Sequence, residues 1–126
     1  GAAIPDDMQG RSFLPILKGS TPGDWRKTFY YHYYEFPGAH SVARHYGVTD
    51  GHYKLINFYE NKDWEMFDLT ADPNEMQSIY GRKEYVGIQS RLEKELARLR
   101  QHYNVPKKDP DSTRPKPRRK RTNNKK

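Results

Sequence analysis

The chain has 126 residues, a formal net charge of +7, a mean hydropathy of −1.18 and no cysteine. This length allows one small domain. Without cysteine, the chain contains no disulfide scaffold, no thiolate metal site and no cysteine nucleophile. No apolar stretch reaches the length of a membrane span, and the first residues lack the charged-then-apolar pattern of a secretory signal.

The positive charge is concentrated at the C-terminus. Residues 106–126 contain ten Lys or Arg and two Asp, a net charge of +8, so residues 1–105 carry a net charge of −1. This stretch has four prolines and no aliphatic or aromatic residue. Because it has little apolar surface to bury, we predict a disordered basic tail. A flexible cluster of cations attracts any polyanion, so weak polyanion contact through the tail is expected.

Residues 1–24 form an irregular arm that is interrupted by Gly and Pro. Only Ser12 to Leu17 is apolar enough to form a short helix or turn. Two interpretations stay open for this cluster. It is either the end of an element that packs on an absent neighbour, or part of a loosely docked arm.

Four segments rich in β-forming residues follow the arm. The predicted strands cover residues 25–35, 42–48, 52–59 and 64–69. Phe36 to Ala39 interrupts the chain after the first strand, whereas Thr49 to Gly51 and Glu60 to Asp63 are expected to be tight turns. Short connections between successive strands are typical of an antiparallel meander.

Two helices are expected after the strands. In Asp72-Pro73-Asn74-Glu75, Asp72 suits an N-cap, Pro73 a first helical position and Glu75 a capping-box partner, which predicts a short helix to Tyr80 that ends at Gly81. A longer helix is predicted by apolar residues at spacings of three and four, namely Tyr85, Ile88, Leu92, Leu96, Leu99 and Tyr103. Its apolar stripe would cover one face of the four-stranded sheet, so the fold class is a two-layer α+β domain.

Three segments in a fixed order carry a family resemblance. Residues 8–19, Met-Gln-Gly-Arg-Ser-Phe-Leu-Pro-Ile-Leu-Lys-Gly, resemble the segment that closes the catalytic domain of bacterial type I sulfatases, which depend on formylglycine. Residues 45–56 resemble the Gly-Val-Arg-Thr…Tyr-Lys-Leu-Ile hairpin of the C-terminal subdomain, and residues 64–75 resemble its Glu-Leu-Tyr-Asp-Leu…Asp-Pro-x-Glu segment. The resemblance spans roughly residues 2–105 and points to N-acetylglucosamine-6-sulfatase-like enzymes.

This resemblance implies a division of the chain. Residues 1–24 would be the end of the catalytic domain and a linker arm, residues 25–105 the α+β subdomain, and residues 106–126 the tail. The parent enzyme would hydrolyse sulfate esters in glycosaminoglycan or mucin desulfation, and it would be periplasmic or secreted. Its formylglycine and calcium are expected in the missing N-terminal catalytic domain, which would be the partner of this chain together with a sulfated glycan substrate.

The chain itself lacks the implied chemistry. Formylglycine is made from the first residue of Cys/Ser-x-Pro-x-Arg, and the nearest string, Ser20-Thr21-Pro22-Gly23-Asp24, has Asp in place of Arg. The pair Asp6-Asp7 lacks the preceding apolar strand of a metal site. We therefore expect no catalytic residue, no metal site and no sulfatase activity in this chain alone.

The candidate substrate-binding residues are His40, Arg44 and His45. By resemblance, loops of this subdomain close one side of the substrate pocket, and arginine is well suited to binding oxyanions. The alternative is that all three are ordinary surface or sheet residues. A metal site from His40, His45 and His52 is disfavoured, because their odd separations point neighbouring side chains to opposite faces of an extended strand.

The run from Tyr30 to Tyr34 is unusually aromatic. Alternation places Tyr31 and Tyr33 on one face of the strand and the other three residues on the opposite face. The face without the helix would be an interface with the catalytic domain or a ligand-stacking platform. The leading hypothesis is a sulfatase subdomain that buttresses the catalytic domain and helps to shape the substrate pocket. The alternative is a non-enzymatic module that binds polyanions or nucleic acid through its tail and aromatic sheet.

Overall fold

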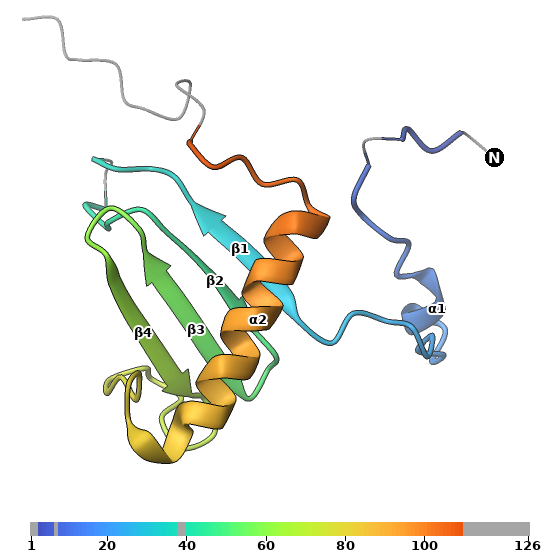
Figure 1. Ribbon diagram of the computed structural model, residues 1–126. Coiled ribbons are helices and arrows are strands. Elements are labelled where there is room, and N and C mark those ends of the chain that lie inside the picture. Colours follow the sequence, from blue (N-terminus) through green and yellow to red (C-terminus); the bar gives the residue numbers. More distant parts are fainter. Residues whose placement is uncertain (1–2, 7, 38–39, 110–126) are drawn as a thin grey trace, which may run out of the picture.

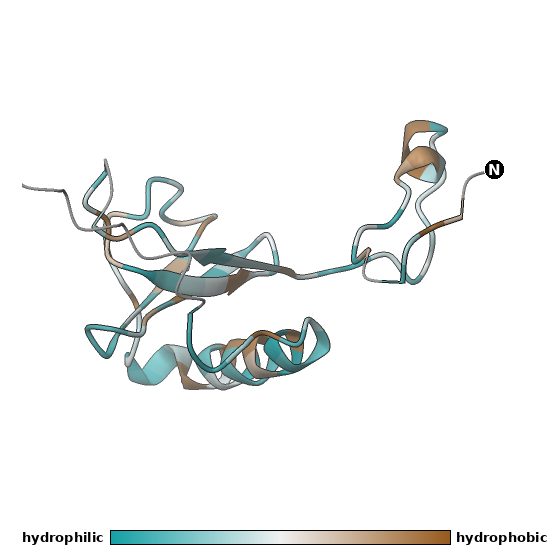
Figure 2. Ribbon diagram, turned by 90° about the horizontal axis from the view of Figure 1, so that it is seen from above, coloured by the Kyte–Doolittle hydropathy of each residue, from teal (hydrophilic) through white to brown (hydrophobic). Residues whose placement is uncertain are grey.

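The computed structural model describes residues 3–6, 8–37 and 40–109. These residues form a four-stranded antiparallel sheet with one long helix packed against one face (Figures 1 and 2). The elements are α1 (Leu14–Leu17), β1 (Phe29–Tyr33), β2 (His45–Thr49), β3 (Tyr53–Phe58), β4 (Asp63–Asp68), the 3-10 helix η1 (Lys83–Tyr85) and α2 (Val86–His102). The strand order β1-β2-β3-β4 is that of a meander, which confirms the predicted α+β fold.

The β2–β3 turn is held by its own side chains. Asp50 Oδ1 accepts hydrogen bonds from the amides of His52, at 2.9 Å, and Tyr53, at 2.7 Å. Gly51 between them has a φ of 88°, in the region that glycine adopts without a Cβ clash. The turn fixes the register in which Val48 faces Leu55.

The first strand is shorter than predicted because its flanks have other partners. Trp25 lies beneath the guanidinium groups of Arg11 and Arg26, at 5.2 and 5.8 Å from its ring centre. The Thr28 hydroxyl donates a hydrogen bond to Glu95 of α2. These contacts turn the chain toward the helix before pairing with β2 begins at Phe29.

The core lies between α2 and the sheet. Leu92, Leu96 and Leu99 are buried on the inner face of α2, and they pack in one cluster with Val48, Leu55 and Met66 of the central strands. Complete burial of such side chains stabilises the fold by about 1.5–3 kcal/mol each. Tyr85, Ile88 and Tyr103 are partly buried around this cluster, so the predicted apolar stripe is confirmed.

The predicted short helix before Gly81 is wrong, because residues 72–80 form turns. Asp72 does accept amide hydrogen bonds, including one of 2.8 Å from Gln77, and these hold the pKa of its carboxyl below its usual range. Glu75, however, has a φ of 55° and pairs with Lys54 at 2.7 Å instead of completing a capping box. The Ile79 amide then donates to the Met66 carbonyl at 2.8 Å, so this segment lies against β4.

Helix α1 of the N-terminal arm stands apart from the sheet (Figure 1). Helix α1 contains no buried residue, and Phe13, Leu14 and Leu17 are exposed. Both interpretations of this apolar cluster therefore stay open. In the described part of the chain, no helix is long and apolar enough to cross a membrane.

Candidate functional site

The three predicted substrate-binding residues do not converge on one point. Arg44 points to the side of the sheet that faces α2, where it lines a pocket with Tyr46 and Arg100. His45 points to the opposite side of the sheet, which we call the open face, where it meets Tyr33. His40 is exposed at a turn in the connection between β1 and β2. No measurement on this chain tests their contact with a substrate, so the assignment stays a prediction.

Arg44 is buried, with a side chain that is 5% exposed. Its Nε donates to the Tyr34 carbonyl at 2.7 Å, and its Nη2 donates to the Phe36 carbonyl at 2.8 Å. Its Nη1 lies 3.4 Å from Glu60 Oε1 and 3.4 Å from Asp109 Oδ2. The guanidinium therefore already has protein partners, and an oxyanion would have to displace one of the two carboxylates.

His45 is held in place by both its ring and its polar edge. Its Nδ1 lies 2.8 Å from the Ala43 carbonyl, which can only accept, so Nδ1 carries the proton. Its ring stacks on Tyr33 with 5.3 Å between centroids and contacts Phe58 at 5.1 Å. His45 is thus part of an aromatic cluster on the open face.

A buried polar network that the sequence did not predict surrounds Asp109. The Tyr59 hydroxyl donates to Asp109 Oδ2 at 2.8 Å, and His32 Nε2 lies 3.8 Å from Asp109 Oδ1. Burial lowers the pKa of His32 to about 4, although Asp109 opposes this shift, so the ring is neutral at neutral pH. Burial and the bond to Asp109 both raise the pKa of Tyr59.

The hydrogen positions of this network follow from its acceptors. Since Asp109 can only accept, the Tyr59 proton points to it, and the Tyr59 oxygen is free to accept from His32 Nε2 at 3.4 Å. His32 Nδ1 then accepts from the Tyr30 hydroxyl at 3.0 Å. The result is a chain of hydrogen bonds from Tyr30 to Asp109 that uses a neutral His32.

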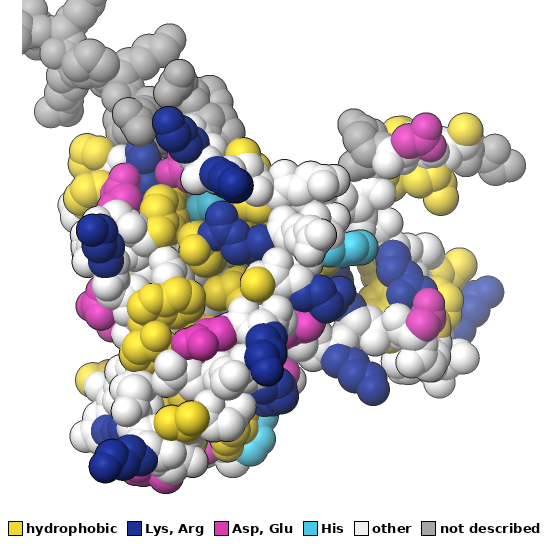
Figure 3. All heavy atoms as spheres, viewed as in Figure 1, with side chains coloured by type: hydrophobic (Ala, Val, Ile, Leu, Met, Phe, Trp, Pro, Cys, Tyr) yellow, Lys and Arg dark blue, Asp and Glu magenta, His cyan; other side chains and the backbone are white. Residues whose placement is uncertain are grey.

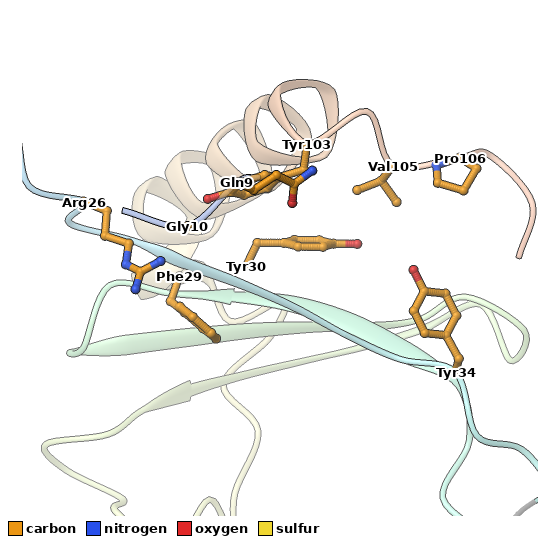
Figure 4. Close-up of a pocket in the computed structure, with 9 residues that line it drawn as sticks. All are labelled: Gln9, Gly10, Arg26, Phe29, Tyr30, Tyr34, Tyr103, Val105 and Pro106. Atoms are coloured by element: carbon orange, nitrogen blue, oxygen red, sulfur yellow. The ribbon is translucent and has the colours of Figure 1, made fainter. Parts of the chain in front are cut away.

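A pocket of about 410 Å³ lies between β1 and the C-terminal end of α2 (Figure 4). Tyr30 lies between Tyr103, which follows α2, and the sheet, and the hydroxyl of Tyr34 points toward Val105 and Pro106. Gln9 and Gly10 of the N-terminal arm close the other end. Residues 105–106, which follow α2, thus face the point where β1 leads into the β1–β2 connection.

The open face of the sheet carries aromatic side chains from three strands. Tyr31, Tyr33, His45 and Phe58 meet there, with Tyr31 and Tyr33 each contacting His45. Figure 2 shows α2 on the other side of the sheet, and no described helix covers this face. The hydroxyls of Tyr31 and Tyr33 are buried without a hydrogen-bond partner among the described residues. The alternation that the sequence predicted is confirmed, with Tyr30 and His32 on the α2 side.

The α2 side does not form a continuous basic surface. Lys and Arg side chains are mixed there with acidic and apolar ones (Figure 3). Arg91 pairs with Asp50 at 2.7 Å, and Arg98 pairs with Glu95 at 2.8 Å. These pairs neutralise part of the positive charge that a polyanion would need. Of the predicted disordered basic tail, residues 106–109 are described and line a pocket on the α2 side of the sheet, contrary to the prediction. Residues 110–126, which hold eight of the ten Lys and Arg of the tail, lie outside the described residues, so the predicted polyanion contact stays a prediction.

The described residues supply no recognisable site for the calcium or the formylglycine expected in the catalytic domain. Among the described residues, no group of three or more His, Cys, Asp or Glu is placed to hold a metal ion. In the nearest formylglycine-like string, Asp24 occupies the position that needs arginine, and it pairs with Arg11 at 3.0 Å. We derive no chemical step through either group from this chain.

Comparison with known proteins decides the family. Residues 1–102 match the family model described as N-sulphoglucosamine sulphohydrolase, C-terminal. The chain belongs to this family. It is 48% identical over 114 residues to an N-acetylglucosamine-6-O-sulfatase of Bacteroides thetaiotaomicron, covering 88% of this chain and 20% of that protein. It therefore corresponds to the C-terminal part of sulfatases and spans about a fifth of the length of such relatives.

Solved structures agree with this family assignment. A protein solved in complex with its substrate D-glucosamine-2-N,6-O-disulfate superposes with a TM-score of 0.76 at 47% identity, covering 81% of this chain and 21% of that one. A phosphonate monoester hydrolase from Silicibacter pomeroyi has a TM-score of 0.67 at 22% identity over 80% and 22% of the chains, which shows the shared fold alone. The alternative of a non-enzymatic polyanion-binding module receives no support from these matches.

Proposed function

We propose that this member of the N-sulphoglucosamine sulphohydrolase C-terminal family is the C-terminal subdomain of a sulfuric ester hydrolase. The family match over residues 1–102 carries this proposal. The names of the relatives suggest a parent enzyme that removes the 6-O-sulfate from sulfated glucosamine units of a glycan. The nucleophilic formylglycine and the calcium would belong to the N-terminal catalytic domain of a periplasmic or secreted parent.

The open face of the sheet is the proposed contact with the catalytic domain. No described helix covers its half-buried aromatic cluster, and apolar patches of this kind mark interfaces. The exposed Leu14 and Leu17 of α1, with Phe13 just before it, add a second apolar surface.

His40 is the proposed substrate contact. It is exposed on the β1–β2 connection, whereas Arg44 has protein partners and His45 belongs to the aromatic cluster. An imidazole at this position can donate to a sugar hydroxyl or a sulfate oxygen. In this proposal, Arg44 and His45 contribute to the substrate pocket by shaping its wall.

The test compares the full-length enzyme with this chain alone on N-acetylglucosamine 6-sulfate and an aryl sulfate. We expect sulfate release from the full-length enzyme and none from the 126-residue chain. In the full-length enzyme, His40→Ala should lower kcat/KM about tenfold, the loss expected for one hydrogen bond to a charged group. His102→Ala, an exposed histidine of α2, is the matched control.

Two results would contradict the proposal. Hydrolysis of the aryl sulfate by the purified chain alone would place a nucleophile where none is expected. Failure of the full-length enzyme to release sulfate from any sulfated sugar would remove the reaction itself. An unchanged kcat/KM for His40→Ala would reject only the role of His40.

A further inference from the structure

The two ends of the β1–β2 connection are fastened to each other by Arg44. Tyr34 and Phe36 follow β1 directly, and Arg44 directly precedes β2. The bonds from the guanidinium to the carbonyls of Tyr34 and Phe36 therefore close the base of the segment that carries His40. The position of His40 depends on this closure, because only a few residues separate it from either end.

A buried guanidinium needs a counter-charge, and Asp109 is the more effective of the two available. Glu60 and Asp109 lie at the same distance, 3.4 Å, from Nη1. The Glu60 side chain is 41% exposed, whereas that of Asp109 is 12% exposed. Water screens an exposed pair far more than a buried one, so Asp109 contributes the larger share of the stabilisation.

Asp109 reaches this position because the chain after α2 turns back over the sheet. Asn104 has a φ of 49°, and the amide of Val105 donates to the Arg100 carbonyl at 2.9 Å, which ends the helix. Residues 105–106 then pass opposite Tyr34 in Figure 4. This segment reaches Asp109, which accepts a hydrogen bond of 2.8 Å from the Tyr59 hydroxyl. We call residues 103–109 the strap.

We propose that Asp109 is a positioning residue that, through Arg44, holds the two ends of the β1–β2 connection and thereby places His40 for substrate binding. The strap joins the C-terminal end of the helix to the segment with the proposed substrate contact, and Asp109 and Arg44 are 65 residues apart in sequence. The effect on substrate binding rests on the proposed function. The anchoring of residues 34–36 and 44 by the strap does not.

The experiment uses Asp109→Asn in the full-length enzyme, because asparagine keeps the size and can still accept from Tyr59 but loses the charge. We expect the backbone amides of residues 33–36 and 44–46 to exchange with solvent about tenfold faster, since a buried charge has lost its principal partner. With N-acetylglucosamine 6-sulfate, KM should rise about fivefold while kcat changes less than twofold, because the reacting groups belong to the other domain. Asp109→Glu, which keeps the negative charge, should bring the amide exchange rates and KM part of the way back to those of the unmodified enzyme.

Two further variants complete the design. Asp24→Asn is the matched control, because it removes a carboxylate from an exposed pair with Arg11. It should change neither the exchange of these backbone amides nor KM. Tyr59→Phe removes one hydrogen bond to Asp109 and should produce a smaller change in the same direction. If Asp109→Asn does not fold, the amide exchange rates and KM of Tyr59→Phe test the inference in its place.

The outcomes separate this inference from the proposed function. Unchanged exchange at residues 33–36 and 44–46 overturns the inference whatever the activity. Faster exchange with an unchanged KM, while His40→Ala does raise KM, also overturns it. If the unmodified enzyme releases no sulfate, the proposed function fails, and the exchange measurement alone decides whether Asp109 anchors these residues.

Discussion

Substitution of Gly47 by alanine tests the tightest contact in the sheet. Gly47 lies in β2, between Tyr31 of β1 and Ile56 of β3. A Cβ added there would lie 2.5 Å from the Tyr31 hydroxyl oxygen and 2.6 Å from the Leu55 carbonyl oxygen. The phenol can swing away, but the carbonyl belongs to the backbone of the β2–β3 pair and cannot move without distorting that pair.

The expected cost follows from this geometry. Overpacking a well-packed site by one methyl group costs about 1–3 kcal/mol, and the fixed carbonyl places Gly47→Ala near 3 kcal/mol. Since 1 kcal/mol shifts the Tm of a domain of this size by about 4–8 °C, we expect a fall in Tm of roughly 12–24 °C. The same methyl group would also push Tyr31 out of the open face.

The assay is thermal and urea unfolding of the chain followed by circular dichroism, with Gly87→Ala as the matched control. A Cβ at Gly87 in α2 has no atom within 4 Å, and alanine favours a helix over glycine by up to about 1 kcal/mol. The two substitutions should therefore shift Tm in opposite directions. An unchanged or higher Tm for Gly47→Ala would refute the steric argument.

Two other substitutions test the core and the buried network. Leu92→Ala, at a fully buried position, should lower the free energy of unfolding in urea by about 2–5 kcal/mol, whereas Leu14→Ala on the exposed α1 should change it by less than about 0.5 kcal/mol; equal effects would contradict the assigned core. Because the pKa of His32 is lowered to about 4 on folding, the unfolded chain binds a proton first as the pH falls. Its contribution to stability is complete above about pH 6.5 and is lost between about pH 6.5 and 4. His32→Gln should flatten this part of the pH dependence, and an identical slope in both proteins would show that His32 titrates normally.

The sheet and the long helix were predictable because their signals are local. The spacing of Leu92, Leu96 and Leu99 defines one helical face, and the structure buries that face. Asp50-Gly51 supplies the side-chain acceptor and the positive φ that the hairpin turn needs. In these segments, local preference and tertiary packing favour the same conformation.

The segment before Gly81 shows where local signals fail. Asp72 caps amides in a turn just as it would in a helix, so a capping pattern alone does not distinguish the two. The difference comes from contacts distant in sequence. Lys54 binds Glu75, and the amide and carbonyl of Met66 are bonded by Ser78 and Ile79.

The network around Asp109 could not be predicted from the sequence. Asp109 stands in a stretch whose composition predicts a disordered tail, and its partners lie 50 to 77 residues earlier in the chain. The chemistry of Arg44 predicts an oxyanion ligand, and this stays a prediction. The fold shows what the sequence could not, namely that two carboxylates of the chain itself, Glu60 and Asp109, already lie beside the guanidinium.

The strap also affects where the limits of this domain should be drawn. The match to the family model ends at residue 102, the last residue of α2. A protein cut at that point would retain the sheet, the helix and the core, yet it would leave the Arg44 guanidinium with only the exposed Glu60 as a counter-charge. Variation among relatives in the few residues after the helix would then change the rigidity of the β1–β2 connection without altering the hydrophobic core.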